Sequence, residues 1–171
     1  MQNSRGFTLI ELLMVVAVIG ILAAIAVPGL LRAKLSGNEA SAIASMRTIH
    51  SAQMTYAAGC GGGGYAPSLA DLATAPPGGT AFIPADLAEA TPAGTPKSGY
   101  EFTITATGAS VLEAGDTCNS ASAASTSTFF VQGDPDATGT SGVRFFATDE
   151  TGQIRADVVQ LANMTAGNPL Q

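Results

Sequence analysis

An almost uncharged apolar stretch near the N-terminus constrains this chain more than any other feature of its sequence. Residues 7–31 read FTLIELLMVVAVIGILAAIAVPGLL, and Glu11 is their only charged residue. Residues 12–31 carry no charge at all. As an α-helix, a run of that length spans roughly 30 Å, the thickness of the hydrocarbon core of a bilayer. The run therefore predicts a helix inserted in a membrane.

A cleaved secretory signal and a soluble core helix both fit the apolar run less well than a membrane helix does. A secretory signal has an apolar region of about 7–15 residues followed by a small-residue cleavage site, whereas this run is longer and leads into a polar helical pattern. A core helix needs protein on all its sides, and a chain of 171 residues is too small to supply it. Arg5 before the run and Arg32 and Lys34 after it do not fix its orientation in a membrane.

The overall composition argues against catalysis and nucleic-acid binding. The chain has 7 Lys+Arg against 13 Asp+Glu, a net charge of −6, and charged residues make up only 12% of it. So few scattered cations cannot form a basic face for phosphates, so we expect no nucleic-acid partner. One His and two Cys are a poor supply of metal ligands and nucleophiles. We assign no catalytic residue and no metal site, expect no cofactor, and do not predict an enzyme.

Residues 1–31 resemble the class III signal and N-terminal helix of type IV pilins and of the related pseudopilins of type II secretion. A short polar leader contains Arg5 and ends at Gly6, Phe7 follows, and Glu11 is the fifth residue after the glycine. Pro28 also lies where the helix of that family usually carries a proline.

The resemblance implies processing, partners and a location. In the family, a prepilin peptidase cuts after the glycine and methylates the new N-terminus, so the cut here would fall between Gly6 and Phe7, and Phe7 would become N-methylphenylalanine. Before assembly the chain would be a single-pass inner-membrane protein in contact with lipid, with its head in the periplasm. An inner-membrane assembly platform would then add it to other copies of itself, in an extracellular pilus filament or a periplasmic pseudopilus.

Glu11 has two interpretations, and the sequence leaves both open. A carboxylate in the first turn of a helix interacts favourably with the positive end of the helix dipole, and at headgroup depth it costs little. The resemblance implies instead an assembly role, in which Glu11 pairs with the N-terminal ammonium of a neighbouring subunit. Within a bundle of apolar helices the dielectric is low, so a carboxylate without a partner is costly there.

Helical periodicity continues beyond the apolar run, and one helix is predicted over residues 7–58. Pro28, which removes a backbone hydrogen bond and clashes with the preceding turn, is expected to break or kink it. The glycine-rich segment Gly59–Gly64 ends it. An apolar stripe is expected along its second half, formed by Leu35, Ala42, Ile43, Met46, Ile49, His50, Gln53, Met54 and Ala57. His50 is interpreted as a packed residue of this stripe, because the chain has no second histidine.

The remainder of the chain predicts a small head. Short helical segments are expected at 68–73 and 84–89. Alternating apolar and polar residues then predict antiparallel strands over Tyr100–Thr107, Thr128–Gln132, Val143–Thr148 and Gln153–Asp157, the last two forming a hairpin. Large apolar side chains are too sparse here for a separate core, so the stripe on the helix must complete it. This predicts an α+β fold, which the resemblance also implies: a pilin-like long N-terminal helix packed against a sheet of three or four strands.

Four regions follow from these patterns. They are a leader peptide at 1–6, a transmembrane and polymerisation helix at 7–31, an amphipathic half of the same helix at 32–58, and an extracytoplasmic head at 59–171.

The head contains two further candidate sites. Cys60 and Cys118 are predicted to form a disulfide if the head is outside the cytoplasm, and two free thiols are the alternative. Asp134 and Asp136 are weak candidates for calcium ligands. Their spacing lacks the full ligand series of a recognised calcium loop, so a solvated acidic turn is expected instead.

The predicted function is that of a structural subunit of a type IV pilus-like filament, with a pseudopilin of type II secretion as the alternative. The loop of small polar residues at 117–128 favours a pilin, because it suits a variable outer surface, whereas a short similarity at Tyr65–Leu69 favours a pseudopilin. A membrane-anchored envelope enzyme or binding module is a more remote alternative. An ordinary membrane anchor has no reason to be cut after Gly6, so processing distinguishes the two classes.

Overall fold

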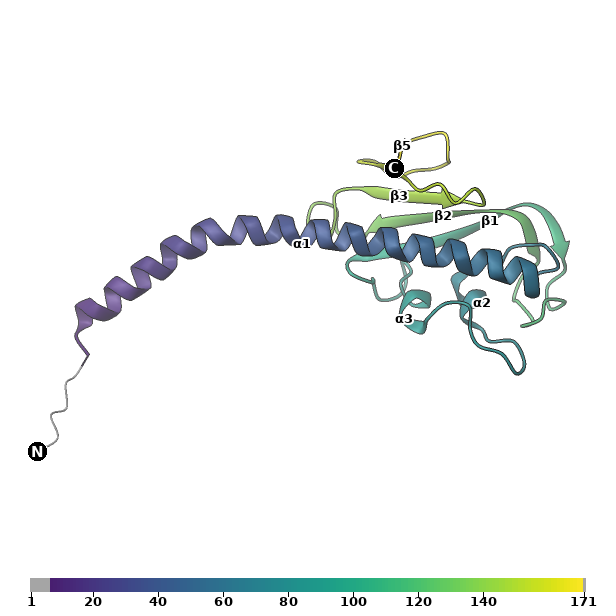
Figure 1. Ribbon diagram of the computed structural model, residues 1–171, viewed down its shortest axis with the longest axis horizontal. Helices are drawn as coiled ribbons and strands as arrows, with labels where there is room; N and C mark the ends of the chain where they lie inside the picture. The colour runs from purple at the N-terminus through teal and green to yellow at the C-terminus, as the bar shows by residue number, and fades with distance from the viewer. Residues whose placement is uncertain (1–6, 171) are drawn as a thin grey trace, which may run out of the picture. The chain divides into compact units, whose positions relative to one another are not determined.

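The computed structural model of the protein describes residues 7–170, and the chain divides into two units, 1–34 and 35–171 (Figure 1). Helix α1 (Leu9–Gly59) belongs to both units, because it begins in the first and ends in the second. Its bounds agree closely with the helix predicted over residues 7–58.

The first unit is the apolar part of α1. All its large apolar side chains are exposed, on every side of the helix, from 76% at Leu9 to 49% at Val15. Among the described residues, α1 is the one helix that is long and apolar enough to cross a membrane. The helix continues through Pro28 without interruption, so the expected break is absent, and a kink at this residue stays a prediction. A single proline removes one backbone hydrogen bond, and the turns on either side keep theirs.

The second unit contains a five-stranded antiparallel sheet in the order β1-β2-β3-β4-β5. Its strands are β1 (Tyr100–Leu112), β2 (Ser125–Pro135), β3 (Phe145–Asp149), β4 (Arg155–Asp157) and β5 (Asn168–Pro169). The predicted α+β class and the β3–β4 hairpin are confirmed, and the sheet has one strand more than expected. The additional strand, β5, has only two residues and includes a proline, so no alternation in the sequence could indicate it.

The second half of α1 lies along one face of the sheet (Figure 1). Met46 and Ile49 are fully buried, as are aromatic side chains of the facing strands such as Phe102 and Phe146. Gly133 of β2 permits this close approach, because a Cβ there would lie only 3.3 Å from the sulfur of Met46. The helix thus completes the core of the head, as the sparse apolar content of residues 59–171 predicted.

The buried face of α1 differs in part from the predicted stripe. It consists of Glu39, Ala42, Ser45, Met46, Ile49, Ala52, Gln53 and Tyr56. Met54 is wrong as a stripe member, since it is 45% exposed, and Leu35 is only half-buried. His50 is half-buried beside Phe129, with a ring-centroid distance of 6.2 Å, which fits its interpretation as a packed residue.

Two short helices, α2 (Leu69–Ala73) and α3 (Ala85–Ala88), occur where helical segments were expected. Ser68 caps α2, because its hydroxyl accepts a hydrogen bond from the backbone N–H of Asp71 at 3.1 Å. Leu72 and Leu87, one from each helix, are fully buried in the core.

Candidate assembly site

Thr8 and Glu11 form a capping box at the start of α1. The Glu11 carboxylate oxygen Oε2 accepts hydrogen bonds from the backbone N–H of Thr8 at 2.8 Å and from its hydroxyl at 2.6 Å. The Thr8 hydroxyl in turn accepts the N–H of Glu11 at 3.3 Å. This reciprocal arrangement satisfies donors that the first turn of a helix otherwise leaves without partners.

Thr8 was not among the residues predicted to form a site, although the sequence contains a signal for it. Thr-Leu-Ile-Glu at residues 8–11 has the spacing of a capping box directly before an apolar run. Glu11 therefore has a local structural role in addition to the two interpretations that its position suggested.

The surroundings of Glu11 leave part of its carboxylate accessible. Its second oxygen, Oε1, accepts no hydrogen bond from any residue between 7 and 170. Phe7, directly before the helix, is 79% exposed, and Gly6 lies outside the described residues. Oε2 thus caps the start of the helix, while Oε1 is available to bind a cationic group of a second molecule.

The head is held to the end of α1 by the Cys60–Cys118 disulfide, which confirms the predicted pairing. Cys60 is buried at the point where the helix ends, and Cys118 is exposed in the loop between β1 and β2. The neighbouring Asn119 is buried, and its side-chain amide donates to the carbonyl oxygens of Asp71 at 2.6 Å and Thr74 at 3.0 Å. The disulfide and this amide together attach the loop to both α1 and α2.

At the opposite end of the head, Glu39 of α1 binds the segment that leads into β3. Its carboxylate accepts hydrogen bonds from the backbone N–H groups of Val143 and Arg144 and contacts the Arg144 guanidinium at 2.8 Å. The Tyr100 hydroxyl donates to the carbonyl oxygen of Arg144 at 2.8 Å. Burial, together with the charge of Glu39, raises the pKa of Tyr100 and keeps it a donor. These contacts fix the head to α1 near the start of the second unit.

Asp134 and Asp136, the weak calcium candidates, are accompanied by a third carboxylate. Glu101 lies directly opposite Asp134 in the β1–β2 register. Burial raises the pKa of Asp134, although the hydrogen bond from Gln160 lowers it in part. Burial also raises the pKa of Glu101, and the charges of Asp136 and Asp134 add to this effect. Among residues 7–170 no three His, Cys, Asp or Glu side chains are grouped so that they could hold a metal ion.

The repulsion between the carboxylates of Asp134 and Glu101 leads to a prediction for Asp134→Asn. At pH 7 the change should stabilise the head by up to about 1 kcal/mol, because it removes a like-charge pair across two strands and keeps an oxygen acceptor for Gln160. The advantage should shrink as the pH falls from 7 to about 4, since raised folded-state pKa values let the folded wild-type protein bind more protons than the unfolded chain. Thermal melts of the full chain in detergent, followed by near-ultraviolet circular dichroism, measure this.

The exposed Glu113 supplies the control for that experiment. Glu113→Gln removes one negative charge from a residue that follows the end of β1, so it should leave the melting temperature nearly unchanged. A stabilisation by Asp134→Asn that does not decrease toward pH 4 would contradict the electrostatic explanation.

Comparisons with known proteins give one family model and two relatives that each match part of the chain. Residues 1–27 match the family model described as the prokaryotic N-terminal methylation motif. The chain is 43% identical over 54 residues to the type IV major pilin protein PilA of Myxococcus xanthus, a match that covers 32% of this chain and 24% of the relative. It is 56% identical over 39 residues to the type IV wide pilus major component PilA4 of Thermus thermophilus, covering 23% of this chain and 30% of the relative.

These matches confirm the resemblance that the sequence indicated. They span less than a third of the length of either relative. No solved structure matches the chain.

Proposed function

We propose that this chain, which matches the prokaryotic N-terminal methylation motif and is similar over part of its length to two major components of type IV pili, is a structural subunit of a type IV pilus-like filament. The observation that carries the proposal is that the Gly6-Phe7 leader boundary lies directly before a helix whose apolar side chains are exposed on every side. Such a helix needs lipid or other helices around it, and an N-terminal cut at this boundary leaves it at the very end of the chain.

The proposed mechanism uses this helix twice. In the inner membrane, lipid covers the apolar side chains, while the head lies in the periplasm. After the prepilin peptidase has cut between Gly6 and Phe7 and methylated Phe7, the assembly platform moves the subunit into the filament, where helices of other copies replace lipid. Packing between apolar helices supplies most of the cohesion.

Glu11 gives this assembly its register. Oε2 stays on the capping box, whereas Oε1 is free to accept the N-terminal ammonium of a neighbouring copy. In a low-dielectric helix bundle, a paired carboxylate is strongly favoured over one without a partner. Because only one longitudinal position brings the two charges together, the pair selects that position.

A pseudopilin of a type II secretion system is the alternative within the same class. The two relatives are named as pilus components, which supports the pilin. The family model covers residues 1–27, a part of the chain that pilins and pseudopilins share, so experiment must decide between the two.

Mechanical shearing of the native cells tests the proposal. If the chain is a pilin, the sheared fraction contains filaments in which this protein is the main component, and a strain lacking the gene yields none. A protein that is processed but stays entirely in the envelope fraction would support the pseudopilin instead. Failure to find it in any filament or membrane fraction would contradict both.

A further inference from the structure

Two adjacent valines of the head are exposed on a loop whose position is fixed. Val158 and Val159 are 65% and 62% exposed, the highest values for large apolar side chains among the described residues of the second unit. They follow β4 directly, and the next residues are anchored: Gln160 donates to the Asp134 carboxylate, and Leu161 is buried. We call residues 157–160 the valine loop. Because the residues on both sides of the valines are held in place, the loop cannot rearrange to bury Val158 and Val159.

A groove with a volume of about 530 Å³ lies between α1 and residues 80–82. We call it the helix groove. Its apolar lining includes Ala52 and Phe82, and Ser51 and Arg47 lie on its α1 side. Phe82 is held in place, because its N–H donates to the carbonyl oxygen of Leu72 at 2.9 Å. The groove is therefore formed before anything binds in it.

The charges of the two surfaces are complementary. Arg47 lines the helix groove, Asp157 begins the valine loop, and neither takes part in an ion pair among the described residues. A second groove, on the outer face of the sheet, is lined by Asp149 and Glu150. It would repel the carboxylate of the valine loop, so charge favours the helix groove.

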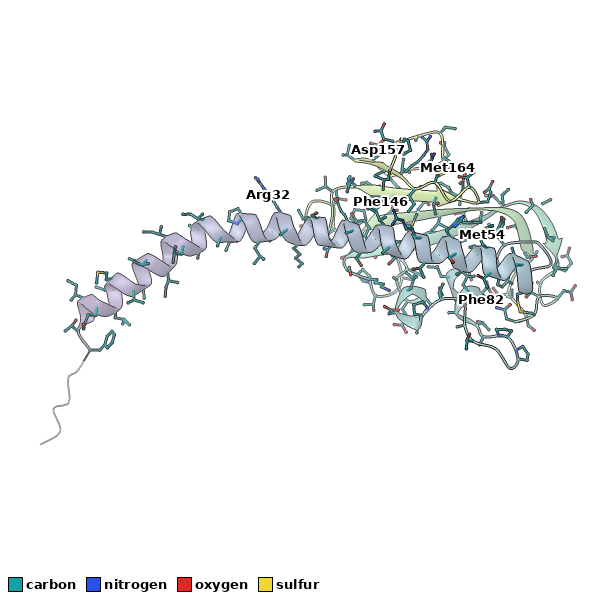
Figure 2. All side chains as sticks on the ribbon, in the orientation of Figure 1. Arg32, Met54, Phe82, Phe146, Asp157 and Met164 are labelled. Carbon is teal, nitrogen blue, oxygen red and sulfur yellow. A yellow bond between two sulfur atoms is a disulfide. The ribbon has the colours of Figure 1, made fainter. Side chains whose placement is uncertain are left out.

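The two surfaces lie on different sides of the head. Figure 2 shows Phe82 and Asp157 on opposite sides of α1 within the second unit. The valine loop cannot reach the helix groove of its own chain, but it can reach that of another copy. A contact between two unlike surfaces leaves one of each free at the ends, so it can repeat without closing and produce an open filament.

We propose that the valine loop of one subunit binds the helix groove of the next, with Val158 and Val159 on its apolar lining and Asp157 paired with Arg47. This contact rests on the proposed filament function and adds a head-to-head interface to the helix bundle. The partner is a second copy of this chain.

Charge reversal in the native cells tests the pair. Arg47→Glu and Asp157→Lys should each lower the yield of sheared filaments by about tenfold, and the double variant should recover to within about twofold of the wild type. The control is Arg47→Glu combined with Glu113→Lys, which has the same net charge as the double variant but should not recover. Equal recovery of both combinations, or single variants with normal yield, would overturn the proposal.

Cross-linking provides a measurement that does not depend on the yield. A chain with Ser51→Cys and Val159→Cys should give a ladder of disulfide-linked multimers in sheared filaments and in the envelope fraction, whereas Ser51→Cys with Ala114→Cys should not. Absence of the ladder while wild-type filaments form would overturn the interface and leave the proposed function intact. Absence of any filament or envelope assembly from the wild type would instead reject the proposed function, and the interface with it.

Discussion

Glu11→Ala is expected to enter the membrane and to be cleaved after Gly6, yet to reduce the filament yield by at least about a hundredfold, because a missing charge pair in a low-dielectric bundle costs several kcal/mol per subunit. The apolar run is unchanged, so insertion does not depend on this side chain. Immunoblots of the processed protein in the envelope and sheared fractions measure both results. Normal filament numbers would reject the pairing of Glu11 with an ammonium.

The capping box makes a sharper experiment possible. Glu11→Gln retains the shape and the acceptor oxygen that cap the helix, since glutamine serves at this position of a capping box, but it removes the charge. Thr8→Val does the reverse, because it removes the capping hydroxyl and leaves the carboxylate. Under the charge-pairing account, Glu11→Gln fails to assemble and Thr8→Val assembles. The opposite pattern would show that Glu11 acts only on its own helix.

Loss of the Cys60–Cys118 disulfide is expected to destabilise the head by roughly 4 kcal/mol, which corresponds to a fall in melting temperature of about 10 °C or more. The bridge joins residues 58 positions apart and connects the end of α1 to the loop between β1 and β2. Cys118→Ser is the suitable variant, because Cys118 is exposed and a serine there adds no buried polar group. The chain has no tryptophan, so tyrosine signals report on the second unit, which contains all three tyrosines.

Reduction of the wild-type protein provides the control for that variant. Dithiothreitol should lower the melting temperature of the wild type to that of Cys118→Ser and should leave the variant itself unchanged. An unreduced wild type that melts together with the variant would contradict the stabilising role of the bridge.

The parts of the fold that were predictable are those with a local pattern. The alternation beginning at Tyr100 predicts the inner face of β1, and this side chain is fully buried as expected. The spacing of Ala42, Met46 and Ile49 predicts the face of α1 that meets the sheet. Strand β1 continues beyond the alternating segment to Leu112, since pairing with β2 extends it past an irregularity after Thr107.

Features that depend on distant partners could not be predicted. Glu39 is a charged residue on a buried helix face, and its partner Arg144 is 105 positions away in the sequence. No local pattern connects them. Glu101 likewise lies beside Asp134 only because the register of β1 and β2 places the two residues opposite each other. The sequence therefore indicated Asp134 and Asp136 as an acidic pair, but not Glu101 as the third carboxylate. Thr8 is different, because its partner Glu11 is three residues away and the capping motif could have been recognised.

The most direct test of the central claim is the mass of the N-terminal peptide of this protein, recovered from sheared filaments. The account predicts a chain that begins at Phe7 and carries one methyl group on its N-terminal nitrogen. A mature chain that still begins at Met1 would contradict it, because the leader would then not be a substrate for processing and the ammonium proposed to pair with Glu11 would not exist at Phe7.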